Sequence, residues 1–142
     1  MRILIFLLII NSGIMATPQP YHYNAELVRV VDCDTIIVNI DLGFDIILKN
    51  KTLRLSKIDA FETRRNSRAK KQSSKFGLSL EEVVSRGKTG SGWLKEYLVG
   101  KDIIINTIET DSFGRWLAVV YVGEEELNSK LITEGFAVKY EP

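Results

Sequence analysis

The chain has 142 residues and a formal net charge of +1, with 45% apolar and 26% charged residues. This size suits one domain with a modest core, and the composition is ordinary for a soluble globular protein. The chain has one cysteine, Cys33, and one histidine, His22, which exclude an intramolecular disulfide and argue against a Cys/His zinc site. Any catalysis is therefore expected to use carboxylates, arginines and a metal ion.

The N-terminus has the layout of a targeting segment. Arg2 precedes an apolar run over residues 3–10, which predicts a signal peptide over residues 1–16. The run is too short to cross a bilayer as a helix, which takes roughly 20 residues. The alternative is that Met15 is the true start and the preceding residues are a misassigned extension. The first interpretation predicts an exported protein, secreted or periplasmic, and the second a cytoplasmic one.

One domain is expected over residues 24–142, after a linker over residues 17–23. β-branched and other apolar residues, interrupted by turn residues, predict its strands. The strands are expected at 24–31, 35–40, 46–48 and 53–58 (one strand or two, around a turn at 49–51), 102–109 and 116–122. A turn is also expected at 42–44, between the second strand and the third.

Two helices are expected among these strands. Ser79 and Glu82 have the spacing of a capping box, and the helix that they begin extends to Leu98. Three glycines inside it each cost about 1 kcal/mol relative to alanine, so it is expected to depend on packing and to break near its centre. A second helix is expected over 126–134, a loop over 62–77 and a short tail over 137–140. This order predicts an α+β fold dominated by β structure, a five-stranded OB-fold-type barrel with one helix inserted before the fourth strand and another near the C-terminus.

Acidic residues lie at the predicted strand ends. Asp34 begins a strand and Asp59 ends another, so in neighbouring strands their carboxylates would converge on one hard cation, Ca²⁺ or Mg²⁺. Glu62 follows Asp59 by three residues and would orient and deprotonate a water beside that metal. The alternatives are turn-capping aspartates, which we favour for Asp32, and a surface glutamate on a mobile loop.

Two arginines accompany these carboxylates. Arg54 lies in an otherwise apolar strand, and Arg115 follows Gly114 at a predicted turn. A planar guanidinium is well suited to holding phosphate oxygens, and two of them would offset the charge of a transition state. The alternatives are a solvated strand face for Arg54 and a plain turn residue for Arg115.

A basic run follows Glu62 directly. It contains Arg64, Arg65, Arg68, Lys70, Lys71 and Lys75 with no acidic residue between them. Such a run is usually a solvated loop, but here it would also track a polyphosphate backbone in a salt-sensitive, sequence-independent way. Phe113 is either a base-stacking residue or a packing residue.

Three separated motifs, in this order and at this spacing, resemble those of the staphylococcal-nuclease (thermonuclease-like) family. They are Val31–Thr35, Arg54–Thr63 and Asp111–Arg115, and Leu127–Ala137 adds a fourth segment. The similarity covers about residues 25–140. It implies a monomeric nuclease, an endonuclease without stable membrane association in the mature form, that hydrolyses DNA and RNA, preferentially single-stranded.

The resemblance also implies roles for residues. Asp34, Asp59 and the backbone carbonyl of Ala60 would bind Ca²⁺, Glu62 would be the general base, and Arg54 and Arg115 would be the phosphate clamp. Apart from the resemblance, Phe113, Arg64 and Arg65 are expected to contact the substrate.

The chain departs from the family pattern at Cys33, which replaces a glycine and would be strained if its turn needs a positive φ. The competing hypothesis is a non-catalytic module for nucleic-acid or protein binding on the same barrel.

Overall fold

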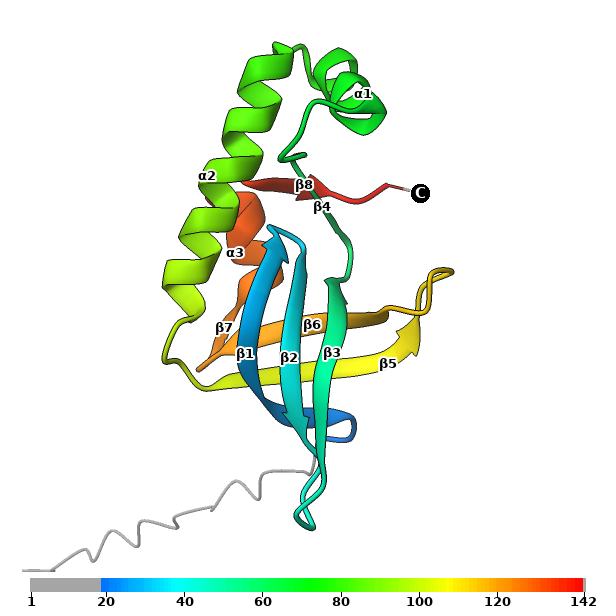
Figure 1. Cartoon of the computed structure of the whole chain (residues 1–142), viewed down its shortest axis with the longest axis vertical. Helices are drawn as coiled ribbons and strands as arrows, with labels where there is room; N and C mark the ends of the chain where they lie inside the picture. Colours follow the sequence, from blue (N-terminus) through cyan, green and yellow to red (C-terminus); the bar gives the residue numbers. More distant parts are fainter. Residues whose placement is uncertain (1–18, 142) are drawn as a thin grey trace, which may run out of the picture.

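The computed structural model describes residues 19–141, and the predicted signal peptide over residues 1–16 lies outside them. Five strands wrap into a barrel in the order β3-β2-β1-β5-β6 (Figure 1), and parallel pairing of β3 with β6 closes it. The predicted α+β barrel is therefore confirmed. The strands are β1 (His22–Asp32), β2 (Thr35–Asp41), β3 (Ile47–Leu55), β5 (Ile103–Thr110) and β6 (Trp116–Val122), with the short β4 (Ile58–Ala60), β7 (Glu125–Glu126) and β8 (Ala137–Lys139) outside the barrel wall.

Alternating side chains fill the barrel. Ile36 and Val38 of β2 are buried in the core, as are Leu53 and Leu55 of β3. Successive residues of a strand point to opposite faces, so Arg54, between two core leucines, lies on the outer face of β3. The closing strand thus carries a cation outward at the point where it ends.

The hairpin between β2 and β3 confirms one predicted turn and not the other. The chain reverses at 42–46, as the turn predicted at 42–44 requires, and the Leu42 N–H donates there to the Ile46 carbonyl at 2.9 Å. No turn forms at 49–51. Asn50 lies inside β3 with a φ of 55°, and its N–H donates to Asn39 Oδ1 at 3.0 Å. The residues that resembled a turn therefore form an irregularity within a continuous strand.

The long helix α2 (Leu80–Leu98) follows the expected capping box. Glu82 N–H donates to Ser79 Oγ at 3.1 Å, and Ser79 N–H donates to Glu82 Oε2 at 2.7 Å. Contrary to the prediction, α2 is continuous across its glycines. Leu94 and Leu98 are buried against the barrel, which provides the packing that offsets the weak helix propensity.

A helix replaces the loop predicted over 62–77. α1 (Ser67–Phe76) begins after Asn66, whose side chain accepts from the Ala69 N–H, and ends at Gly77 with a φ of 65°. Only Ala69 and Gln72 of α1 are buried, so its apolar periodicity is too weak to mark a helix. Two helices, not one, therefore precede β5, the fourth barrel strand.

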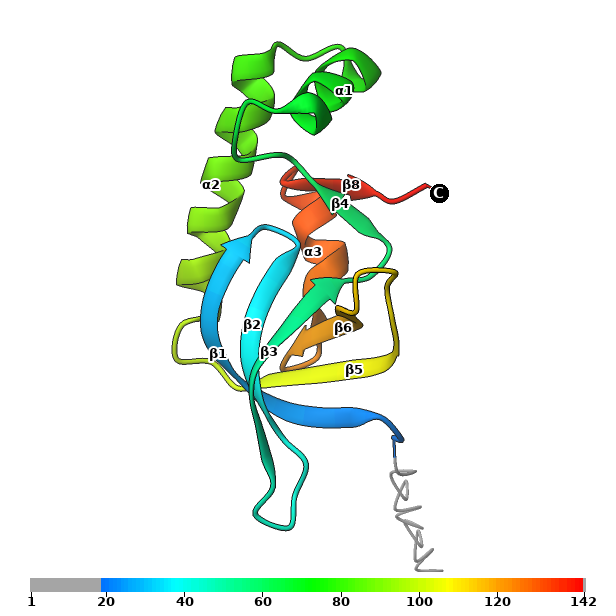
Figure 2. The ribbon, with the colours of Figure 1, turned by 45° about the vertical axis from the view of Figure 1, so that its right-hand side comes forward.

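The C-terminal region also carries more structure than expected. The second predicted helix is confirmed as α3 (Leu127–Thr133), and the expected tail forms β8, which pairs antiparallel with β4. Figure 2 shows this β4–β8 pair between α1 and the barrel. Within residues 19–141, no helix combines the length and apolar character that a membrane span requires.

Gly87 of α2 provides a test of how the helix is placed. A Cβ there would overlap the carbonyl oxygens of Phe61 and Glu62, whereas a Cβ at Gly92 meets no neighbour. Gly87→Ala is expected to lower the free energy of unfolding by about 1–3 kcal/mol through overpacking. Gly92→Ala, the matched control, is expected to raise it by up to about 1 kcal/mol through helix propensity. Urea denaturation measures both, and equal effects of the two changes would refute the close approach.

Candidate functional site

The predicted site residues lie where the barrel meets β4 and α1. Arg54 lies next to the end of β3, Asp59 and Ala60 lie in β4, and Glu62 lies on the segment that leads to α1. Asp34 lies in the turn between β1 and β2, and Arg115 lies between β5 and β6. Five segments of the chain thus contribute to one region.

Asp34 is buried, and both of its carboxylate oxygens accept hydrogen bonds. Its Oδ2 accepts from the Ala60 N–H at 2.7 Å, and its Oδ1 accepts from Thr35 Oγ1 at 3.0 Å. Burial raises the pKa of the Asp34 carboxyl to about 6; Arg54 and the Ala60 hydrogen bond oppose this shift and Asp32 adds to it. Asp32 itself accepts from the Asp34 N–H at 3.1 Å, which is the turn role expected for it.

Arg54 connects the two aspartates that were predicted to bind metal. Its Nη2 lies 3.1 Å from Asp34 Oδ2 and 3.5 Å from Asp59 Oδ1. Its Nη1 donates to the Leu55 carbonyl at 2.8 Å, which fixes the plane of the guanidinium. The two carboxylates therefore converge on one guanidinium, although β4 pairs with β8 and not with the strands next to Asp34.

Arg68 of α1 contacts two predicted site residues, although the sequence predicted it only as part of the basic run. Its Nη2 lies 3.1 Å from Asp59 Oδ1, and its Nε lies 3.1 Å from Glu62 Oε1. Asn66 donates to the other carboxylate oxygen of Glu62, Oε2, at 2.8 Å. Glu62 is thus held in place from the N-terminal end of α1.

Gln72 of α1 is a second residue that sequence reasoning missed. It is buried, and its Nε2 donates to the Ala60 carbonyl at 2.8 Å and to Asp59 Oδ2 at 3.4 Å. Its Oε1 accepts from the Glu62 N–H at 3.0 Å. One amide therefore sets the relative positions of three predicted site residues.

A signal for α1 was present in the sequence. Asn66 is a good N-cap residue, Gly77 is a good C′ residue, and the residues between them include several strong helix formers. A helix assigned from these ends would have placed Arg68 and Gln72 at helical spacing, on adjacent turns.

Arg115 is oriented by Asp111. Its Nε lies 2.7 Å from Asp111 Oδ2, and Asp111 Oδ1 accepts from the N–H groups of Phe113 and Arg115 at 2.9 Å each. Desolvation opposes the change, but these hydrogen bonds and the guanidinium lower the pKa of the Asp111 carboxyl. Asp111 therefore supports the site by orienting Arg115.

Two cavities contain most of the predicted residues. A cavity of about 50 Å³ is lined by Asp34, Arg54, Ala60, Glu62 and Arg115, among others. A larger one of about 520 Å³ is lined by Arg54, Asp59, Phe113 and Arg115, among others. Arg54 and Arg115 line both, so the two predicted clamp residues face the same space.

Arg64 and Arg65 stand apart from this arrangement. Both are exposed, and the guanidinium of Arg65 pairs with Glu81 of α2 at 3.1 Å. Neither of them lines either of the two cavities. The structure thus does not bring these two predicted substrate contacts to the site.

The donors suit a hard cation. Within residues 19–141, no three His, Cys, Asp or Glu side chains form a metal cluster. The candidate ligands are instead two carboxylates, Asp34 and Asp59, and the Ala60 carbonyl, all of them oxygen donors of the kind that Ca²⁺ prefers. The Ala60 oxygen has two lone pairs, so the hydrogen bond from Gln72 leaves one for a ligand bond. These residues fit a calcium ion that completes its shell with water.

Cys33 is accommodated without backbone strain. It is absent from the residues with positive φ in the described chain, so the strain that a family glycine position suggested does not arise. Its side chain is buried, and a Cβ on Gly90 of α2 would lie 2.9 Å from its Sγ. The sulfur therefore packs against α2 where that helix has no side chain.

The thiol of Cys33 is expected to be inert in the folded protein. Burial, followed by the charges of Asp34 and Asp32, raises its pKa to about 12, and the thiolate is the reactive form. An aryl disulfide reagent at about pH 8 should modify it only when urea unfolds the chain. Absorbance of the released thiolate measures the rate, and fast modification of the native protein would contradict this burial.

The comparisons with known proteins agree with this geometry. The sequence model of the family described as "Staphylococcal nuclease homologue" matches residues 52–142. A thermonuclease of Staphylococcus hyicus is 32% identical over 114 residues, which make up 79% of this chain and 56% of the relative. The chain thus spans little more than half the length of that relative. The matched range includes Arg54, Asp59, Glu62 and Arg115, and the chain belongs to the staphylococcal nuclease family.

Proposed function

We propose that this protein is a calcium-dependent nuclease that hydrolyses phosphodiester bonds within DNA and RNA. The observation that carries the proposal is the convergence of Asp34 and Asp59 beside a cavity lined by Glu62, Arg54 and Arg115. Together these residues provide carboxylates that can bind a cation, a general base and two groups that can bind phosphate. We include in the proposal a preference for single strands and action as a monomer.

Asp34, Asp59 and the carbonyl of Ala60 would hold the calcium ion. When bound, such an ion polarises a phosphoryl oxygen and offsets developing negative charge. The burial of Asp34 favours this role, because a desolvated carboxylate gains most from a nearby cation. Gln72 contributes by fixing Asp59 and Ala60 relative to each other.

Glu62 is proposed as the general base. Glu62 lines the small cavity, where it would take a proton from the attacking water. The water oxygen bonds to phosphorus as the bond from phosphorus to the leaving oxygen of the strand breaks. Arg68 and Asn66 each contact one of the Glu62 carboxylate oxygens, so the orientation of that carboxylate is set before substrate enters. Since the Glu62 N–H is bonded to Gln72, its backbone is fixed as well.

Arg54 and Arg115 are proposed to bind the nonbridging oxygens of the phosphate. Each guanidinium is held through part of its donor set, Arg54 by Leu55 and the aspartates and Arg115 by Asp111. A preoriented donor stabilises the charge of the transition state without further reorganisation. Phe113, 83% exposed on the larger cavity, would stack on a neighbouring base.

Removal of calcium tests the proposal directly. Purified protein is expected to cleave single-stranded DNA and RNA with calcium and to stop when a chelator is added, because the phosphate then loses its metal contact. Gel analysis of end-labelled strands measures the cleavage and shows whether cuts are internal. Binding without turnover, from a folded sample with calcium present, would refute the nuclease and favour the non-catalytic binding module.

Glu62→Gln tests the base. The amide keeps the size of the side chain but takes no proton, so kcat is expected to fall by about 10²–10⁴-fold with KM little changed. Glu124→Gln, at an exposed turn after β6, removes the same charge and serves as the control. Circular dichroism checks that both variants fold. A Glu62→Gln enzyme as fast as the control would remove Glu62 from the mechanism.

A further inference from the structure

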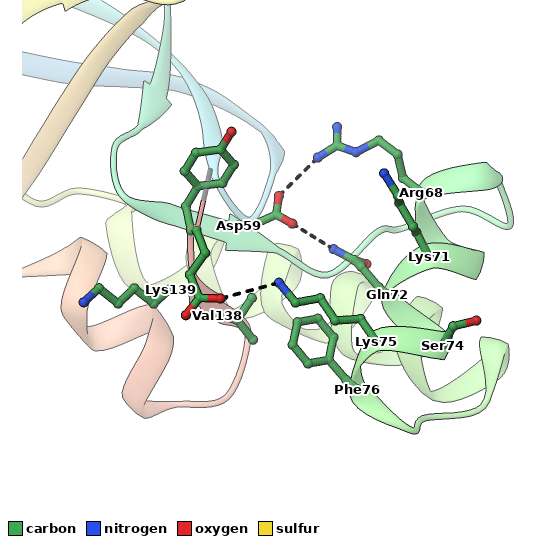
Figure 3. Close-up of a pocket in the computed structure, with 11 residues that line it drawn as sticks. Asp59, Arg68, Lys71, Gln72, Ser74, Lys75, Phe76, Val138 and Lys139 are labelled. Atoms are coloured by element: carbon green, nitrogen blue, oxygen red, sulfur yellow. Dashed lines mark hydrogen bonds and ion pairs between the residues drawn. The ribbon is translucent and has the colours of Figure 1, made fainter.

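A groove of about 750 Å³ lies between α1 and the β4–β8 pair (Figure 3). It begins at Asp59, and α1 forms one wall with Arg68, Lys71 and Lys75. β8 lies on the other side, where the side chain of Lys139 points away from α1. The volume of the groove is that of a typical ligand pocket. Apart from Asp59, Arg68 and Gln72, the catalytic proposal uses none of the residues that line it.

The basic residues of α1 in the groove share one helix face. Arg68, Lys71 and Lys75 are spaced by three and four residues, which places them side by side along the helix. They give the groove three basic side chains against two acidic ones, Asp59 and Glu141. The one lysine pairing there, Lys75 Nζ to Glu141 Oε2, is long at 3.9 Å. The groove thus retains a net positive charge suited to an anionic chain.

Two aromatic side chains accompany these charges. Phe76 lines the groove at the end of α1, and Tyr140, 54% exposed, lines it beyond β8. The lining therefore alternates cations with aromatic surface. That combination is typical of single-strand binding, in which lysines follow the backbone and bases stack on rings.

The groove is continuous with the candidate site. Asp59, Arg68 and Tyr140 line both the groove and the 520 Å³ cavity that contains Arg54 and Arg115. A strand whose phosphate lies between those two arginines would therefore pass Asp59 and enter the groove.

We propose that this groove is a second subsite, which binds the nucleotides of a single-stranded DNA or RNA next to the scissile phosphate. Lys71 and Lys75 bind the phosphates, and Tyr140 and Phe76 contact the bases. The inference rests on the proposed function for the identity of its ligand. It also divides the basic run of the sequence: Arg68, Lys71 and Lys75 face the groove, whereas Arg64, Arg65 and Lys70 do not line it.

The test measures binding separately from cleavage. A fluorescent single strand of about 12 thymidines is titrated by anisotropy, with chelator present, over a series of salt concentrations. The variant Lys71→Gln/Lys75→Gln is compared with Lys49→Gln/Lys51→Gln. The control lysines lie in β3 near the β2–β3 hairpin, at the end of the molecule remote from α1 in Figure 1.

The groove variant is expected to bind roughly tenfold more weakly, with the slope of log K against log salt shallower by about 1.4. The control variant is expected to match the unmodified protein. As a second measurement, a strand carrying a photoreactive thiothymidine is expected to crosslink to Tyr140 or Phe76. Equal losses in both variants, or no loss in the groove variant, would overturn the subsite.

The cleavage assay with calcium separates a failure of the subsite from a failure of the proposed nuclease function. Groove-dependent binding without cleavage would overturn the nuclease and leave the subsite. Cleavage with groove-independent binding would overturn the subsite alone.

Discussion

The buried charge of Asp34 is the constraint on which the site depends. A carboxylate removed from water costs several kcal/mol unless it is paired and hydrogen-bonded. Its partners come from different parts of the chain: Thr35 begins β2, Arg54 lies at the end of β3, and Ala60 ends β4. The cost of the charge is therefore met only when β4 folds back over the end of the barrel. The same position of β4 that satisfies the buried Asp34 carboxylate also places Asp59 close to it.

A second constraint comes from the helix behind the site. α2 approaches the chain so closely at Gly87 and Gly90 that a methyl group at either position would collide with it, at the backbone of Glu62 or at Cys33 and Phe136. A glycine lowers helix stability by about 1 kcal/mol relative to alanine. At Gly87 and Gly90 this loss accompanies a closer approach of α2 to its neighbours. The contact at Gly87 involves the Glu62 backbone, so α2 restricts the position of that backbone. α1 and its N-cap residue hold the Glu62 side chain through Arg68 and Asn66.

The sequence predicted the elements with a strong hydrophobic period and the charges at their ends. The barrel strands follow the alternation of residues such as Ile36 and Val38. Asp34 and Asp59 do lie close together, but through β4, which pairs with β8, and not through two neighbouring barrel strands. The turn predicted at 49–51 is wrong because Asn50 has the residue type of a turn but adopts its left-handed backbone inside a strand. Such a distinction depends on the partner strand, whose Asn39 side chain binds the Asn50 N–H, and no local pattern contains it.

The helix that the sequence failed to predict shows why a polar segment can carry this much of a site. α1 buries only Ala69 and Gln72. The buried amide of Gln72 forms hydrogen bonds to Ala60, Asp59 and the Glu62 backbone and adds little apolar contact. The remaining surface of α1 is free to carry lysines. A helix that holds a polar site on one face and presents cations on another has no need of an apolar stripe. Its sequence therefore resembles that of a solvated loop, and only its two caps distinguish the two.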